Sequence, residues 1–261
     1  METKQLTANL FNGWFLVDQS KFTRKKIEGT PIDVHFCKII NDAINDFISK
    51  NENKKENNTY VDIFSYSGKG LRHNWGGELP DLSVNSSAPL DVIEAVKTVD
   101  DAGQISTKFK HTPLFMYPTP YGESYLGWSL SVIYNNCVKN KEFPNRLTIL
   151  SCTLTFDETH KDDLIVALEY ADKFKENGTE ICFAHMTVGR EKPNTFPSNE
   201  MELIDSTSQF AFKIASEMSD KERFSANKQW ECDLHKGSRF CITNSNPKTI
   251  KDFIQFVFTP E

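Results

Sequence analysis

The sequence predicts an α/β protein with a doubly wound, mostly parallel sheet and helices on both faces. Trp14–Val17 is a continuous apolar run, which is typical of a strand buried on both faces, and Arg146–Cys152 is interpreted as another buried strand. Amphipathic segments with apolar residues three and four positions apart alternate with these runs, which indicates βαβ units. Because one large α/β domain can fill 261 residues, we expect a single domain, 1–261, with an elaborated insertion around 67–102.

The first half of the chain is predicted to open with the buried strand Trp14–Val17. A helix follows, with Thr30 as its N-cap and Pro31 in its first turn, and its apolar positions run to Phe47. The next elements are expected to be a strand at Tyr60–Tyr66, an irregular Gly-, Pro- and Ser-rich segment over 67–102 with a short helix possible at Pro89–Lys97, and an edge strand at Gln104–Phe109.

The second half repeats the alternation of helices and strands. Gly178 is well placed to stop one of these helices. The predicted elements are helices at Gly122–Val138, Lys161–Asn177, Asn199–Met218 and Pro247–Phe258, and strands at Arg146–Cys152, Glu180–Met186 and Phe240–Thr243.

Composition excludes several functional classes. The net charge is −6, from 30 basic and 36 acidic residues spread along the chain, which argues against a nucleic-acid binder. No apolar run reaches 18 residues, so we expect no membrane span, and Met1–Leu10 lacks a signal-peptide core, so we expect a cytoplasmic protein. The six cysteines show no CxxC pair or zinc spacing and are expected to be reduced and structural.

Common catalytic motifs are absent. The chain contains no GxSxG, no GxxxxGK[ST], no GxGxxG after the first strand and no HExxH. His185 falls in a buried strand and is interpreted as a core histidine, and Asp157–Glu158 as part of a charge cluster at a helix start. The sequence therefore indicates no enzyme class.

Three oxygen-bearing side chains are predicted to converge at the carboxyl end of the sheet. Asp18 and Ser20 follow the first strand directly, and Thr119 precedes the Gly122 helix. Ligands of open α/β sheets bind at this end of the strands. Carboxylate and hydroxyl oxygens are the ligands that Mg²⁺ prefers, so the three residues are a candidate metal site.

These residues carry a family resemblance. Trp14–Ser20 resembles the opening of bacterial von Willebrand factor A domains, in which a buried strand runs into Asp-x-Ser-x-Ser. Tyr117–Pro120 resembles their Gly-Thr-Pro segment, and Thr195–Ser198, Leu203–Asp205 and Phe210–Ser216 resemble a bacterial cytoplasmic branch. The resemblance implies a Rossmann-like, von Willebrand A-type fold over nearly the whole chain and a role in binding another protein.

The sequence departs from this family at two of the five positions of its metal-ion-dependent adhesion site. Phe22 stands at the second serine position. Leu154, within Thr153–Thr155, stands where the family has an aspartate. The site is therefore interpreted as degenerate, with weak Mg²⁺ binding or none, unless Asp157 restores it. In the alternative interpretation, Asp18 is a turn residue that accepts backbone hydrogen bonds, and Ser20 and Thr119 satisfy one another.

Three functional hypotheses remain open. The first is a non-catalytic protein–protein interaction module, an accessory subunit of a bacterial stress, signalling or defence system, with Trp75, Arg24 and Lys25 as partner-binding residues and no cofactor. The second is a Mg²⁺-dependent adhesion-type domain of the same family. The third is an enzyme with an unrecognised site, such as Asp157 and Glu158 with His160. The sequence does not predict the oligomeric state.

Overall fold

Strand β1 (Phe11–Asp18) lies inside the sheet, because it pairs in parallel with β4 (Thr59–Ser67) on one side and with β8 (Arg146–Ser151) on the other. Every β1 residue after Phe11 is buried, as predicted for a strand covered on both faces. The computed structural model describes residues 11–51, 59–79, 90–99, 105–152, 154, 160–188 and 193–258.

In the described part of the chain, seven strands form one sheet in the order β10-β11-β9-β8-β1-β4-β5. The chain leaves β1 for β4 and later returns to β8 on the other side of β1, so the strand order reverses there. This mostly parallel sheet confirms the α/β class. The parallel strands β9 (Glu180–Met186) and β11 (Cys241–Asn244) extend it beyond β8, and the antiparallel strands β5 (Gly70–Leu79) and β10 (Asn194–Thr195) close its two edges.

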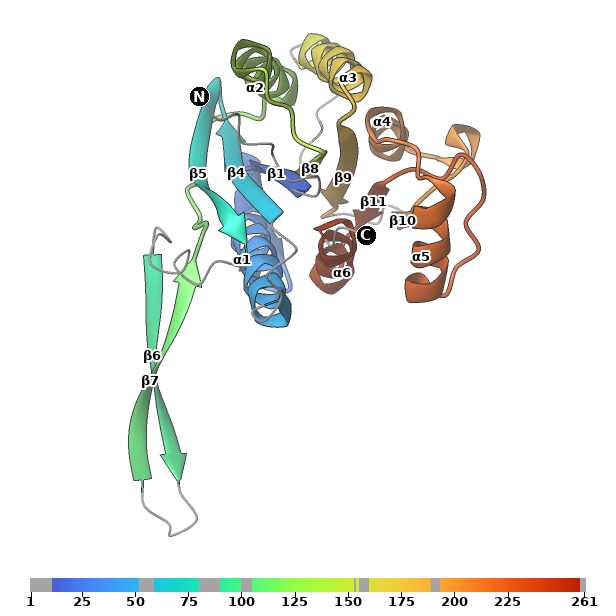
Figure 1. The fold of residues 1–261 in the computed structure, drawn as a ribbon. Helices are drawn as coiled ribbons and strands as arrows, with labels where there is room; N and C mark the ends of the chain where they lie inside the picture. Colours follow the sequence, from blue (N-terminus) through green and yellow to red (C-terminus); the bar gives the residue numbers. More distant parts are fainter. Residues whose placement is uncertain are drawn as a thin grey trace, which may run out of the picture.

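Helices cover both faces of the sheet (Figure 1). The alternation of β1 explains why: Phe15 and Val17 belong to one buried cluster, and Trp14 and Leu16 to another. The first cluster lies under α1 (Ile32–Asn51) and α6 (Pro247–Phe258), and the second under α2 (Leu126–Asn140), α3 (Lys161–Glu176) and α4 (Ser206–Ile214).

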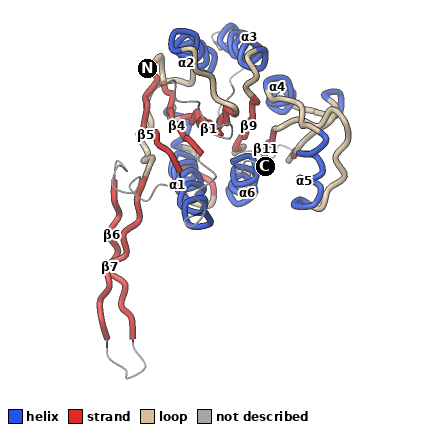
Figure 2. Tube along the Cα trace, viewed as in Figure 1, coloured by secondary structure: helices blue, strands red, loops and turns tan. Residues whose placement is uncertain are grey.

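The segment after β4 differs most from the prediction. Residues 70–79 form β5, and β6 (Leu90–Val99) and β7 (Ile105–Leu114) form a long antiparallel hairpin that projects from the body (Figures 1 and 2). The irregular segment is therefore wrong over 70–79 and 90–99, and so is the helix at Pro89–Lys97, whereas β7 confirms the edge strand predicted at Gln104–Phe109; residues 80–89 lie outside the described residues. The β-branched residues of β6 favour a strand once a partner strand pairs with it, and this tertiary pairing is invisible in local periodicity.

Two helix boundaries also differ from the prediction. Thr30–Pro31 is the short strand β3, paired with β2 (Lys26–Ile27), so α1 begins at Ile32 and Thr30 lies outside it. The helix predicted over Asn199–Met218 is divided into a 3-10 turn at Glu200–Glu202 and α4. A further helix, α5 (Asp220–Trp230), begins at Ser219 with a capping box that involves Glu222.

The N-terminus of α2 is capped by its neighbour α3. The carboxylate of Asp163 accepts hydrogen bonds from the backbone N–H groups of Gly127 (2.9 Å) and Trp128 (2.9 Å). Gly127 permits this approach, because a Cβ there would lie 2.0 Å from the carbonyl oxygen of Asp163. The aspartate at the start of α3 thus satisfies two donors of another helix.

The six cysteines are free, as the sequence predicted, and all but Cys232 are buried. Burial raises the pKa of the Cys37, Cys137 and Cys182 thiols to about 12. These thiols therefore stay protonated and pack as small apolar groups. Among the described residues, no helix is both long and apolar enough to cross a bilayer.

Arg146 joins four elements at the amino end of the sheet. From the start of β8, its guanidinium donates to Glu180 of β9 (Nε to Oε2, 2.9 Å), to Glu222 of α5 (2.8 Å) and to the carbonyl oxygen of Val257 in α6 (2.7 Å). The side chains of Arg146 and Glu222 are both nearly buried. Each charge therefore depends on the other for the compensation that water would give it at the surface.

Replacing Arg146 by methionine should lower the free energy of unfolding by about 3 kcal/mol or more, because Glu222 would remain buried without its cation. The measurement is urea denaturation at pH 7. Lys213→Ala, which breaks the exposed pair with Glu200, is the control and should change it by less than about 1 kcal/mol. Adding Glu222→Gln to Arg146→Met should recover part of the loss; a further loss of similar size would contradict this role.

Candidate functional site

The candidate site is the turn that follows β1, at the carboxyl end of the sheet. The Asp18 side chain is fully buried, and its Oδ1 accepts a hydrogen bond from the backbone N–H of Ser20 at 2.9 Å. Its Oδ2 lies 3.5 Å from the backbone nitrogen of Cys152, just after the neighbouring strand β8. Asp18 therefore closes a turn and ties together the ends of two adjacent strands.

Burial raises the pKa of Asp18 from its ordinary value of 3.8 to about 6. The hydrogen bonds from Ser20 and Cys152 oppose this shift but do not cancel it. The carboxylate is thus ionised at neutral pH in surroundings that disfavour its charge.

Three buried hydroxyl groups lie at the ends of neighbouring strands. They belong to Ser20 after β1, Tyr66 of β4 and Ser151 of β8. None makes a hydrogen bond of good geometry among the described residues, although the Tyr66 hydroxyl lies near those of Ser151 and Ser124, and the Ser20 hydroxyl lies near the Asp18 carboxylate. Burial and the charge of Asp18 raise the pKa of Tyr66 well above its usual value, so its hydroxyl stays protonated. The cluster combines one carboxylate with weak hydrogen-bonding groups, and it contains no side chain that is both exposed and activated as a nucleophile.

Two side-chain amides fix the loop that carries Thr119. The Oε1 atom of Gln19 accepts from the backbone N–H of Thr119 at 2.7 Å. The buried Asn41 of α1 accepts from the N–H groups of Phe115 (2.7 Å) and Met116 (3.1 Å) and donates to the carbonyl oxygen of Met116 (2.8 Å). Both side-chain amides satisfy backbone N–H and C=O groups of this loop that a neighbouring strand would otherwise pair with.

The structure brings the predicted residues together only in part. Asp18 and Ser20 share one turn. Thr119 is held through its backbone N–H by the side chain of Gln19, the residue between Asp18 and Ser20. The turn role of Asp18 is confirmed. The mutual hydrogen bond of Ser20 and Thr119 is wrong, because Ser20 Oγ has no partner among the described residues. Asp157 lies outside the described residues.

The residues that hold a metal elsewhere in proteins do not gather at this site. In the described part of the chain, no three His, Cys, Asp or Glu side chains are placed to hold a metal ion. Weak Mg²⁺ binding or none stays a prediction.

Four residues of the site were missed. Ser151 is the last residue of β8 and Tyr66 is the last but one of β4, so the rule that placed Asp18 at the carboxyl end would also have found them. Gln19 and Asn41 carry no such signal, because their roles depend on a loop 100 and 75 residues away in the sequence, respectively.

A rim of basic and aromatic side chains surrounds this buried cluster. Arg24 and Lys25 are exposed, as their predicted role requires, and Arg24 Nη2 donates to the carbonyl oxygen of Pro120 at 3.2 Å. Tyr121 is 54% exposed. Further members are Lys21, which pairs with Glu123, Lys69, which lies 5.8 Å from the Tyr125 ring, and Arg72, which lies 5.0 Å from the Tyr117 ring.

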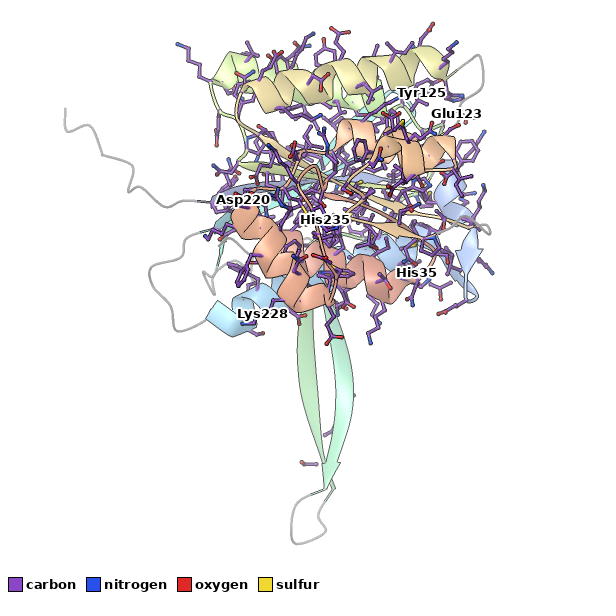
Figure 3. All side chains as sticks on the ribbon, turned by 90° about the vertical axis from the view of Figure 1, so that its right-hand side faces the viewer. His35, Glu123, Tyr125, Asp220, Lys228 and His235 are labelled. Atoms are coloured by element: carbon purple, nitrogen blue, oxygen red, sulfur yellow. The ribbon has the colours of Figure 1, made fainter. Side chains whose placement is uncertain are left out.

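Figure 3 shows where this rim lies on the molecule. Glu123 and Tyr125 lie on its right side, together with His35 of α1. Asp220 and Lys228 of α5 lie on its left side, toward the opposite end of the sheet.

Trp75 is not part of the exposed rim. Its side chain is only 5% exposed, and its ring packs on Phe115 with the centroids 4.7 Å apart. The prediction of Trp75 as a partner-binding residue is therefore corrected. Trp75 lies in β5 opposite Ile63, on the sheet face that packs against α1.

The residues of the enzyme hypothesis are described only in part. His160 lies at the start of α3, with its ring 5.6 Å from that of Tyr125, whereas Asp157 and Glu158 lie outside the described residues. His185 is a core histidine, as predicted, and burial lowers its pKa to about 4.

The fold and site define an α/β protein with a buried carboxylate under a basic and aromatic rim. No protein-family model and no curated protein sequence matches this chain. The structure of the pilus adhesin SpaC from Lactobacillus rhamnosus GG is similar over 96% of this chain, with 10% sequence identity and a TM-score of 0.52. The PilB minor pilin from Streptococcus sanguinis is similar over 99%, with 10% identity and a TM-score of 0.48.

This chain spans 30% of the length of the adhesin and 65% of that of the minor pilin. At such identity the adhesin shows a shared fold alone, and the lower similarity of the minor pilin supports no argument.

These findings correct the resemblance to von Willebrand factor A domains. The structural neighbour that shares the fold is a pilus adhesin, and no family model or curated protein supports that family. The physical reason is that the motifs have local roles: Asp18 closes a turn, and Thr119 is held by its backbone. Three predictions rested on this family assignment and are corrected with it. They are the degenerate metal-ion-dependent adhesion site, the accessory-subunit role and the Mg²⁺-dependent alternative.

Asp18→Asn should remove part of the pH dependence of stability. The raised pKa means that the folded protein binds this proton more tightly than the unfolded chain, so wild-type stability falls as the pH rises from about 4 to about 6. Asparagine cannot ionise, so the stability of the variant relative to wild type should rise over this range by up to about 3 kcal/mol and then level off. Urea denaturation between pH 4 and 8 measures this difference, and a constant difference would contradict it.

Tyr66→Phe tests whether the Tyr66 hydroxyl is satisfied by the nearby hydroxyls of Ser151 and Ser124. Because the Tyr66 hydroxyl makes no hydrogen bond of good geometry, its removal should leave the free energy of unfolding unchanged within about 0.5 kcal/mol, or raise it by about 1 kcal/mol. Urea denaturation at pH 7 measures it. Tyr134→Phe, which removes a hydroxyl that accepts from Asn177 at 3.3 Å, is the comparison. A loss of 2 kcal/mol or so for Tyr66→Phe would show that this hydroxyl is satisfied.

Proposed function

We propose that this chain is a non-catalytic protein-binding domain that uses the basic and aromatic rim at the carboxyl end of its sheet. The observation that carries the proposal is the rim itself, with Arg24, Lys25 and Tyr121 exposed above a buried and fixed base. The structural neighbour is a pilus adhesin, which supports a binding or adhesive role. We also propose that the sheet is of the doubly wound, Rossmann-like type. Its strand order reverses at β1, and the rim lies above this point, where ligands of such sheets bind.

The base of the rim favours binding because it is already ordered. The Tyr121 N–H donates to the carbonyl oxygen of Gln19 (2.9 Å), and the Lys21 N–H donates to that of Gly122 (2.8 Å). These bonds join the turn after β1 to the loop before α2. A surface fixed in this way loses little conformational entropy when a partner binds.

The side chains of the rim favour an acidic partner. Arg24, Lys25, Lys69 and Arg72 all carry positive charge at neutral pH, and Glu123 is already paired with Lys21. Tyrosine and arginine are the residue types that dominate binding energy in protein interfaces. An acidic segment of another protein would pair with the cations while its apolar groups cover the tyrosines.

Several observations support a role without catalysis. The thiols of Cys37, Cys137 and Cys182 are held protonated, and His185 is buried away from solvent. The enzyme alternative with His160, Asp157 and Glu158 would be favoured by turnover in a phosphatase or nuclease screen that is lost in His160→Ala. A cytoplasmic location and the absence of nucleic-acid and membrane partners stay predictions; the free cysteines support the first.

Reversing two charges of the rim should abolish partner binding. The tagged wild-type chain and Arg24→Glu/Lys25→Glu are used for quantitative co-purification from the native cell with mass spectrometry. A specific partner should be enriched by wild type and depleted at least ten-fold by the double variant, because two attractions become repulsions. Binding should also weaken as salt is raised.

Lys228→Glu is the matched control, because Lys228 is an exposed cation of α5 on the opposite side of the molecule (Figure 3). It should recover the partner as wild type does. Equal recovery by the rim variant, or equal loss in Lys228→Glu, would contradict a binding surface at the rim.

A further inference from the structure

A pocket of about 420 Å³ lies between α2 and the edge of the sheet formed by β4 and β5, apart from the rim. Its size is typical of a small-ligand site. Apolar walls come from both sides, with Phe64 and Leu71 on the sheet and Ile133 and Cys137 on α2. Polar side chains line the rest of the pocket, and two polar features among them indicate which ligand would fit.

The first polar feature is a nearly buried carboxylate. Asp62 of β4 is 8% exposed, and its Oδ1 lies 2.7 Å from Nε2 of His73. A carboxylate can accept further hydrogen bonds while it keeps this one. Glu142 at the mouth of the pocket adds a second negative charge. The pocket therefore disfavours anions and attracts a cation.

The second polar feature is an indole N–H. Trp14 of β1 is 9% exposed, it lines the pocket, and its Nε1 is buried with no hydrogen-bond partner among the described residues. Buried indole N–H groups usually have a partner. Because the Nε1 atom itself has almost no exposed surface, a ligand in the pocket would supply an acceptor once a neighbouring side chain moves aside.

The strand pairing places these two groups side by side. Trp14 and Asp62 are direct partners in the parallel pair β1–β4, so they share a face of the sheet at a strand spacing of about 4.8 Å. A ligand that used both would carry its donor and its acceptor only a few bonds apart.

A β-bulge completes this arrangement. Ile63 pairs with Trp75 and Phe64 with His73, so Asn74 is the extra residue of β5, and His73 is turned to the face of Phe64. Gly76 leaves the space for the Asp62 carboxylate, because a Cβ there would lie 2.1 Å from Asp62 Oδ1. Bulges that re-aim a side chain are common beside functional sites.

We propose that this pocket binds an α-ammonium group next to a carbonyl, as found at the N-terminus of a polypeptide or in a free amino acid derivative. Asp62 accepts from the ammonium group, and the indole N–H of Trp14 donates to the carbonyl oxygen. The faces of Trp14 and Phe64, whose ring centroids are 5.4 Å apart, add cation–π attraction. The apolar walls contact an aliphatic side chain. This proposal does not depend on the function of the rim.

Calorimetric titration of the full chain with four probes tests the ligand chemistry. Leucinamide and the peptide Leu-Gly-Gly have the free ammonium group and the carbonyl. N-acetyl-Leu-Gly-Gly lacks the cation, and isoamylamine is leucinamide without its carboxamide. The first two should bind at least about ten-fold more tightly than the last two, the effect of one charge-assisted or buried hydrogen bond. Binding of leucinamide alone would identify a free amino acid derivative, and tighter binding of the peptide a chain terminus.

Two variants separate the roles of the polar groups. Trp14→Phe keeps a ring but removes the N–H, so it should abolish the preference for leucinamide over isoamylamine. Asp62→Asn should weaken the binding of both amines at least about ten-fold. Trp128→Phe in α2 and Asp42→Asn, whose carboxylate pairs with Lys251, lie outside the pocket lining and should bind as wild type does.

Circular dichroism and urea denaturation show whether each variant is folded. Failure of leucinamide and Leu-Gly-Gly to bind at millimolar concentration would overturn the proposal. Equal binding of the acetylated and free peptides, or wild-type binding by folded Asp62→Asn, would also overturn it. None of these results affects the partner-binding test of the rim, which uses other residues and another readout.

Discussion

The parallel pairing of β1 with β4 on one side and β8 on the other is the constraint on which the rest of the structure depends. A strand paired on both edges and covered on both faces must be apolar in both directions, and Phe15 and Leu16 accordingly belong to separate buried clusters under opposite helix layers. The same pairing brings the ends of three strands together. The turn after β1 is therefore surrounded by protein, and a polar side chain there has to find its partners within the fold.

Asp18 shows the consequence of this enclosure. A charged group without water needs hydrogen bonds, and the backbone N–H groups of Ser20 and Cys152 are those within reach. They offset desolvation only in part, so the pKa of the carboxyl stays raised. The side-chain amides of Gln19 and Asn41 satisfy the neighbouring loop by the same logic. The carboxyl end of the sheet is thus a buried polar layer that fixes the loops above it.

The sequence allowed the sheet and most helices to be predicted, because buried strands and amphipathic helices leave local periodic patterns. Strand β9 and helix α6 have the predicted bounds. Of the β6–β7 hairpin, the start of β7 was predicted, whereas β6 was mistaken for a helix, because its residues Val92, Val96 and Val99 recur at helical spacing. The β-bulge at Asn74, which one inserted residue produces, was also missed. At the site, Asp18 and Ser20 could be placed together by adjacency. The similarity of these short motifs to a known family was misleading, because a turn after a buried strand needs such residues in any fold.

The burial of Trp75 and the pocket beside Trp14 have one cause. With Asn74 as an extra residue in β5, Trp75 stays on the α1 face and packs on Phe115, whereas His73 is turned to the α2 face and reaches Asp62. A regular strand would place residues 73 and 75 on the same face. The bulge therefore removes the tryptophan from the surface and at the same time places an acidic, aromatic pocket on the other side of the sheet. Bulges are common at sheet edges, and this one also re-aims a side chain into the pocket proposed to bind a ligand.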